Sequence, residues 1–456
     1  MLRRLGALCQ KRSLRENRET AIAANSSSSR TSLATVALVL CAALLLNPAA
    51  CTTLPRGNAP SDASGAAAPR GFPASVRILS SDRHSLWTGS RQILSRLRGA
   101  ATDGEVDILA ISGGGAGGAF GAGALVGLTR KGTRPQFELV TGVSTGALIA
   151  PFAFLGPAWD KRLTEAAMTA GNGSLLQWRG GILYDPAVYS GEPLARFVDR
   201  FVTSELVAAV AAEAAKGRML LVATTDLDKE ESVIWDLGAI AAHGGEEARM
   251  LFRDVLTASA SIPGVFPPVM IRVEENGVAY DEMHVDGGTI QSFFVAPEID
   301  RFLPVDVDGL EGVNVYVVIN SQIGVSAGTT PLSTIPIVTR SYSATMKHIS
   351  RRDIGMAAAF ALRHRMNFHF TEIPVEYPFP GLLDFRAPTI QALFNYAVAC
   401  AAGGYLWTTL DQGLKSASSG SSSESRPAAD GPFAQCPAGR AAMDEKDMRK
   451  TARSPR

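Results

Sequence analysis

Short apolar runs and longer stretches of helical pattern alternate through the middle of the chain. Apolar runs rich in β-branched residues predict strands, at 106–112, 137–141, 219–225, 278–280 and 312–319. Helical patterns lie between them, and also after them, at 119–126, 147–153, 191–216, 246–261 and 331–405. Strands that are apolar along their whole length are typical of a mainly parallel sheet with helices on both faces. The pattern therefore predicts a three-layer α/β fold with the functional site at the carboxyl ends of the strands, plus a mostly helical C-terminal extension.

The amino end has the pattern of an export signal. Residues 1–32 are polar and basic, 33–46 are almost unbroken Ala, Val and Leu, and small residues lead to Cys51. The apolar run is shorter than the roughly 20 residues that a permanent membrane span needs. Cys51 after two alanines resembles a bacterial lipoprotein cleavage site, although Pro48 stands where such sites usually carry Leu. We expect an exported protein anchored in the cell envelope through lipidated Cys51; a plain cleaved signal and an uncleaved anchor stay open.

Composition also predicts how the chain is divided. A stretch rich in Pro, Gly, Ser and Ala predicts a flexible tether, and a serine-rich start followed by mixed charge predicts a disordered tail. The ordered body lies between them and consists of the α/β domain and its helical extension. The expected segments, in order, are 1–51, 52–75, 76–330, 331–415 and 416–456.

Charge and cysteine usage exclude several classes of function. The 456 residues include 44 Lys and Arg against 43 Asp and Glu, and no basic block is interleaved with aromatic residues, so nucleic acid is not an expected partner. The five cysteines show no CxxC spacing, and the six histidines form no HExxH. Neither a structural zinc site nor a disulfide framework is therefore expected, and we predict no metal and no cofactor.

A glycine-rich turn, 113–118, follows the first core strand and opens a helix. This arrangement points free backbone N–H groups at a negative charge. Gly113, Gly115 and Gly118 match GxGxxG, with Glu138 about 20 residues further on, as in a dinucleotide-binding turn. An oxyanion hole needs the same glycines, because backbone amides must approach a developing alkoxide closely. A tight turn without a ligand is the third interpretation.

The next strand-to-helix junction favours the oxyanion hole. Gly142-Val143-Ser144-Thr145-Gly146 is a GxSxG sequence between a predicted strand and a predicted helix, which is the setting of a nucleophile elbow. A serine nucleophile needs a base, and Asp286 stands before Gly287 and Gly288 in a turn that can project its carboxylate.

Four blocks in this order resemble the patatin-like phospholipases. They are GGGxxG at 113–118, GxSTG at 142–146, ASxSxPxxFPP at 258–268 and DGG at 286–288, and the resemblance covers roughly residues 106–320. It implies a hydrolase of lipid acyl esters at 76–330, with Ser144 as nucleophile, Asp286 as base and an oxyanion hole. The oxyanion hole would be formed by the amides of Gly113, Gly114, Gly115 and Gly118.

The resemblance also implies partners: a lipid or phospholipid substrate and a membrane surface. One departure concerns Gly117, which stands where the family often has Arg or Lys. If that cation supports the turn or a negatively charged substrate, its loss bears on rate or head-group preference. The sequence leaves the oligomeric state open.

Two other functions remain open at this stage. A Ser–Asp–His triad of α/β-hydrolase type would take its imidazole from His348, His364 or His369. A catalytically silent, lipid-binding envelope protein is the other alternative. The arginines of the extension form a mild basic cluster, interpreted either as a contact for anionic head groups or as a solvated helix face: Arg351, Arg352, Arg363 and Arg365.

Overall fold

The computed structural model describes most of the chain between residues 67 and 409. The described ranges are 67–82, 93–173, 175–178, 186–295, 309–324 and 328–409, without the side chains of 334, 335 and 339. The predicted export segment, Cys51 and the predicted tail lie outside these ranges. Within them, no helix has the length and apolarity that crossing a membrane requires.

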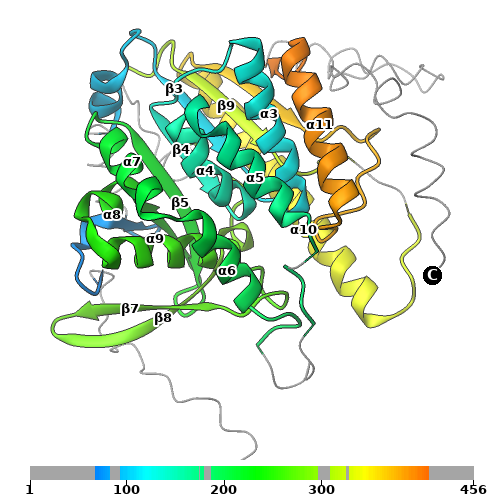
Figure 1. Ribbon diagram of the computed structural model, residues 1–456, viewed down its shortest axis with the longest axis horizontal. Helices are drawn as coiled ribbons and strands as arrows, with labels where there is room; N and C mark the ends of the chain where they lie inside the picture. The colour runs from blue at the N-terminus through cyan, green and yellow to red at the C-terminus, as the bar shows by residue number, and fades with distance from the viewer. Residues whose placement is uncertain are drawn as a thin grey trace, which may run out of the picture. The chain divides into compact units, whose positions relative to one another are not determined.

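Parallel strands form the centre of the sheet, as predicted (Figure 1), and there are five of them. In spatial order they are β5 (Met219–Asp226), β4 (Leu139–Val143), β3 (Asp107–Ile111), β9 (Asn314–Ile319) and β10 (Asn367–Glu372). The first four coincide with predicted apolar runs. β10 lies inside the C-terminal segment, which is mostly helical as predicted, but the sequence did not indicate this strand. Its Asn-Phe-His-Phe-Thr-Glu sequence lacks the unbroken apolar run that marks the other four strands.

Antiparallel strands extend both sides of this centre. They are β1 (Ala68–Pro69), β2 (Arg77–Leu79), β6 (Glu231–Asp236), β7 (Val269–Glu275), β8 (Val278–Asp286) and β11 (Thr408–Thr409). β8 pairs with β5, and β7 joins it to β1. The tether predicted to reach residue 75 is wrong at its end, because Ala67 is buried and β1 pairs with β7.

Helices cover both faces of the sheet and give the predicted three layers. The first face carries α3 (Gly118–Lys131), α4 (Thr145–Leu155), α5 (Asp160–Ala170), α6 (Glu192–Phe201), α7 (Ser204–Ala214), α8 (Leu237–His243), α9 (Gly245–Ser259) and α11 (Ala387–Gly403). The second carries a helix at 93–100 and the end of α10 (Thr334–Arg363). Along β3, Leu109 and Ile111 join the first core, whereas Ile108 and Ala110 join the second.

Cys400 corrects the expectation about the cysteines. This residue is buried on α11 and is disulfide-bonded. Spacing along the chain does not show which cysteines meet in a fold, since a disulfide depends on the distance and direction of the two side chains. The other four cysteines lie outside the described residues.

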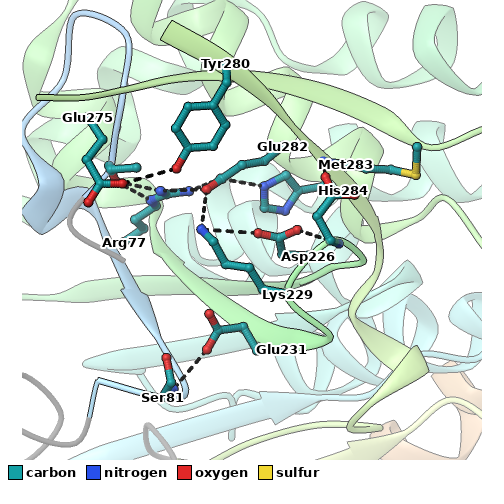
Figure 2. A network of polar contacts seen from close by, with 12 residues as sticks. Arg77, Ser81, Asp226, Lys229, Glu231, Glu275, Tyr280, Glu282, Met283 and His284 are labelled. Atoms are coloured by element: carbon teal, nitrogen blue, oxygen red, sulfur yellow. Dashed lines mark hydrogen bonds and ion pairs between the residues drawn. The ribbon is translucent and has the colours of Figure 1, made fainter. Parts of the chain in front are cut away.

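A buried network of charges fastens β8 to its neighbours (Figure 2). Arg77 on β2 forms an ion pair with Glu282 on β8. Lys229 Nζ lies 2.6 Å from Glu282 Oε1 and 3.5 Å from Asp226 Oδ2. His284 Nε2 lies 3.3 Å from Glu282 Oε2. Because Asp226 and His284 face each other across the β5–β8 pair, the network fixes the strand that ends at the DGG block.

Replacing Glu282 by glutamine is expected to lower the free energy of unfolding by about 3 kcal/mol at pH 7. The change leaves Arg77 buried without its anion. The neighbouring His284, Arg77 and Lys229 together hold the pKa of Glu282 well below its usual range, against the effect of burial. The contribution of this carboxylate is therefore present above pH 4.5 and is lost as the pH falls further. Urea unfolding at pH 7 and below pH 4 should show the gap between wild type and variant narrowing in acid.

The exposed Glu246–Arg249 pair on α9 is the matched control. Glu246→Gln breaks an ion pair at the surface, where solvent screens the charges, and should leave the unfolding midpoint nearly unchanged. Equal effects of the two variants would contradict a structural role for the buried network.

Candidate active site

Ser144 stands at a sharp turn between β4 and α4. Its backbone has φ 56° and ψ −126°, a conformation that side-chain-bearing residues rarely adopt and that stores about 1–3 kcal/mol of strain. The flanking glycines are required by close packing: a Cβ at Gly142 would lie 2.7 Å from Ala147 Cα, and one at Gly146 would lie 2.2 Å from Ile111 O. The GxSxG sequence therefore forms the strand–turn–helix geometry expected of an elbow.

Asp286 ends β8 and lies against this turn. Ser144 Oγ donates a hydrogen bond to Asp286 Oδ2 at 2.5 Å, and the Gly288 N–H donates to Oδ1 at 2.7 Å. The carboxyl is only 2% exposed, and burial raises its pKa to about 7, with the two hydrogen bonds acting in the opposite direction. A carboxyl with such a pKa exchanges protons near neutrality.

The ASxSxPxxFPP block supports both groups, a role that its sequence did not reveal. Ser259 Oγ accepts from the Ser144 N–H at 3.0 Å and donates to Ala223 O at 2.7 Å. Ser261 O accepts from the Asp286 N–H at 2.9 Å. The two serines of this block therefore fix the backbones on either side of the Ser144–Asp286 hydrogen bond.

The glycine turn lies beside Ser144, but its amides are not equivalent. The Gly113 N–H donates to Ser292 O at 3.0 Å, and the Gly118 N–H bonds inside its own turn. The amides of Gly114 and Gly115 have no acceptor among the described residues. Of the four glycines predicted to supply donors, the geometry leaves these two available. The sequence alone does not show which backbone N–H groups already donate hydrogen bonds within the fold.

Asn320, at the end of β9, holds the turn in place and was not foreseen from the sequence. Its side chain accepts from the Gly121 N–H at 3.0 Å and donates to Ser112 O at 2.8 Å. The backbone carbonyl oxygen of Asn320 would lie 1.9 Å from a Cβ at Gly117 and 2.0 Å from one at Gly114. No side chain fits at position 117 against this backbone. Close packing therefore explains why the chain has glycine where the patatin-like family often has Arg or Lys.

Two cavities meet at Ser144. The first, called the apolar cavity, lies among α4, α5 and α6 and is lined by side chains such as Leu148, Phe152, Leu163, Phe197 and Phe201. The second, called the polar chamber, is lined by Asp286, Ser321, one face of α10 and residues 379–382. Among the residues that the structure describes, Gly115, Ser144 and Ile262 alone line both cavities.

The histidines considered for a triad lie elsewhere. His348 is exposed, His364 is buried against Phe360, and His369 stacks on Tyr316. No hydrogen bond joins any described histidine to Ser144 or Asp286. Glu138, the acid of the dinucleotide interpretation, instead accepts from the Asp107 N–H at 2.8 Å, at the opposite end of β3 from the glycine turn.

Three side chains of metal-ligand type lie together in the buried network. Ligand atoms of Asp226, Glu282 and His284 are within 4.8 Å of one another. Arg77 and Lys229 already oppose the two carboxylates there, so their charge is balanced without an ion.

A match to a protein-family model agrees with the four-block resemblance. A family model described as patatin-like phospholipase matches residues 109–298, so the α/β core carries a patatin-like phospholipase domain, which implies lipid acyl hydrolase activity. A search of curated proteins finds no match. Among solved structures the chain is similar to VipD from Legionella pneumophila, with 13% identity, 67% of this chain and 68% of that chain covered, and a TM-score of 0.28.

Proposed function

We propose that this protein hydrolyses acyl esters of lipids through a dyad of Ser144 and Asp286. The observation that carries the proposal is the 2.5 Å hydrogen bond from Ser144 Oγ to Asp286, made where the two cavities meet. A carboxyl with an ordinary pKa near 4 is a poor base for a hydroxyl. Burial that raises the pKa of Asp286 to about 7 makes this carboxylate a better one.

The first half-reaction transfers the acyl group to the protein. Asp286 accepts the Ser144 proton as Oγ bonds to the ester carbonyl carbon, and the carbonyl oxygen becomes an oxyanion. The amides of Gly114 and Gly115 stabilise that charge, each contributing about 3 kcal/mol. The bond to the alkoxy oxygen then breaks, and the alcohol leaves with the proton that Asp286 held.

The second half-reaction releases the fatty acid. Water attacks the acyl carbon while Asp286 takes its proton, and the bond to Ser144 Oγ breaks as the serine regains that proton. The acyl chain would lie in the apolar cavity, whose walls are almost entirely hydrocarbon and contribute by removing apolar surface from water. No step requires a metal or a cofactor.

A membrane surface, reached through a lipidated Cys51, belongs to this proposal as the place where the substrate is met. That part rests on the amino-terminal sequence alone.

Labelling with a fluorophosphonate tests the nucleophile directly. We expect a covalent adduct that peptide mass spectrometry places on Ser144, with the label suppressed by a lipid ester. Ser204→Ala, which removes an exposed serine on α7, is the control and should be labelled as wild type is. A folded protein that gives no adduct, and releases no fatty acid from phospholipids or short acyl esters, would end the proposal.

A further inference from the structure

The two arms of the site differ in chemistry, and this inference rests on the proposed function. The acyl chain accounts for the apolar cavity. The alcohol part of the same ester must then extend from Ser144 into the polar chamber, because the two spaces share little besides the serine and one edge of the glycine turn. The residues that line the polar chamber therefore determine which alcohol moiety of the ester is accepted.

One face of α10 forms a wall of the chamber beside the dyad. Tyr342 and Met346, one turn apart, lie close to Asp286: the carboxylate raises the pKa of the Tyr342 phenol further than burial alone, and Met346 Sδ would contact a Cβ at Gly288. Arg340, Ser343 and Lys347 continue the same face at helical spacing. All of α10 lies beyond the segment that the family model matches.

The chamber has a positive electrostatic character. Lys347 Nζ donates to Gly324 O at 3.2 Å, and burial, Arg340 and Arg351 each lower its pKa, as expected where cations gather. Among the described residues, Asp286 is the only carboxyl that lines the chamber. Glu372 is not among the chamber's lining residues: its carboxylate accepts from the Ile323 N–H at 2.8 Å, and burial raises its pKa to about 7. Its charge raises the pKa of Lys347 against the other effects.

We propose that Lys347 and Arg340 of α10 bind the phosphodiester of the ester's alcohol moiety, which makes glycerophospholipids preferred over neutral glycerides. A phosphodiester carries one negative charge and unesterified oxygens that accept from an ammonium and a guanidinium. Ser343 lies between the two cations on the same face and can donate a further hydrogen bond.

The outer end of the chamber indicates which part of the head group is recognised. Arg340 and Ser343 also line an open groove along residues 380–386. The group attached to the far side of the phosphate would extend into this groove towards solvent. We therefore expect the protein to contact the phosphate directly and to make few contacts with the choline, glycerol or other group attached beyond it.

The test compares two substrates that differ only in the phosphate-bearing group. Dihexanoylphosphatidylcholine and dihexanoylglycerol are supplied as monomers to the full chain, and the ratio of their kcat/KM values is measured. Lys347→Met is expected to lower this ratio by about 10- to 100-fold, the loss that follows from removing a charge-assisted hydrogen bond. Lys347→Arg keeps the charge and should retain most of the wild-type ratio.

Arg363→Gln is the matched control, because it removes an exposed cation near the end of the same helix. It should leave the ratio at the wild-type value. A ratio that Lys347→Met does not change would overturn the inference. So would a ratio that changes only on anionic vesicles and not with monomers, since that result assigns the cations to the lipid surface.

A binding measurement separates this inference from the proposed function. Ser144→Ala is titrated calorimetrically with monomeric dihexanoylphosphatidylcholine, with and without Lys347→Met. Binding that weakens at least 10-fold on losing Lys347 supports the phosphodiester site even if the wild-type protein hydrolyses neither substrate. Equal binding to both proteins refutes the site, whether or not hydrolysis is observed.

Discussion

Ser144→Ala is expected to reduce lipid ester hydrolysis by at least about 10⁴-fold. On the proposed mechanism the variant removes the atom that forms the acyl-enzyme, while the amides of the glycine turn and the two cavities remain, and comparable losses follow the removal of other activated serines. Single-turnover release of fatty acid from a short-chain ester measures the effect. The fold should persist, because the Ser144 backbone is held through its N–H by Ser259.

Substitutions at the same position should also differ in their effect on stability. Ser144→Gly loses the nucleophile equally but relieves the strain of φ 56°. We expect its unfolding free energy to exceed that of Ser144→Ala by about 1 kcal/mol, measured by urea denaturation. Hydrolysis that survives in both variants would show that another residue is the nucleophile.

Asp286→Asn is expected to reduce kcat/KM by about 10⁴-fold. The amide can still accept from the Gly288 N–H, so the turn should keep its shape, but it cannot take the serine proton. In the wild-type protein kcat/KM should rise with pH and level off above about pH 7, because only the ionised Asp286 acts as base and burial raises its pKa to about 7. A profile without this inflection would contradict the assignment.

Stability should respond to pH in the opposite sense. A carboxyl whose pKa is raised by folding favours the folded state when protonated, and this contribution is lost as the pH rises towards 7. Asp286→Asn should therefore be the more stable protein at pH 8, by a few kcal/mol. His348→Ala and His369→Ala serve as controls for activity, and a loss in either variant would favour a triad.

The order of strands and helices could be predicted because each central apolar run is buried on both sides of the sheet. Ser144 and Asp286 could be singled out because glycines mark the turns that carry them. Their 2.5 Å contact, however, joins residues 142 positions apart and depends on β8 pairing with β5, which no local pattern encodes.

The supporting residues were harder to predict because they act through contacts between distant segments. Asn320 and Ser259 are polar residues whose importance comes only from the backbones that they touch. On α10, the sequence drew attention to Arg351 and Arg352, but Arg351 donates to Ile323 O and Arg352 pairs with Asp353. A cation's position in a helix does not by itself identify the cavity that it faces.

On the proposed mechanism, the wall that α10 adds places the chemical step and the choice of substrate in separate stretches of the chain. The serine, the carboxylate and the glycine turn all precede residue 298, whereas Tyr342 and Met346, which line the polar chamber together with the carboxylate, follow it. Mutations after residue 330 could therefore change which lipids are cleaved while the reacting groups stay the same. A chain cut at the end of the matched segment would lack the α10 residues that line the chamber with Asp286, so we expect this carboxyl to be more exposed there and its pKa to be lower.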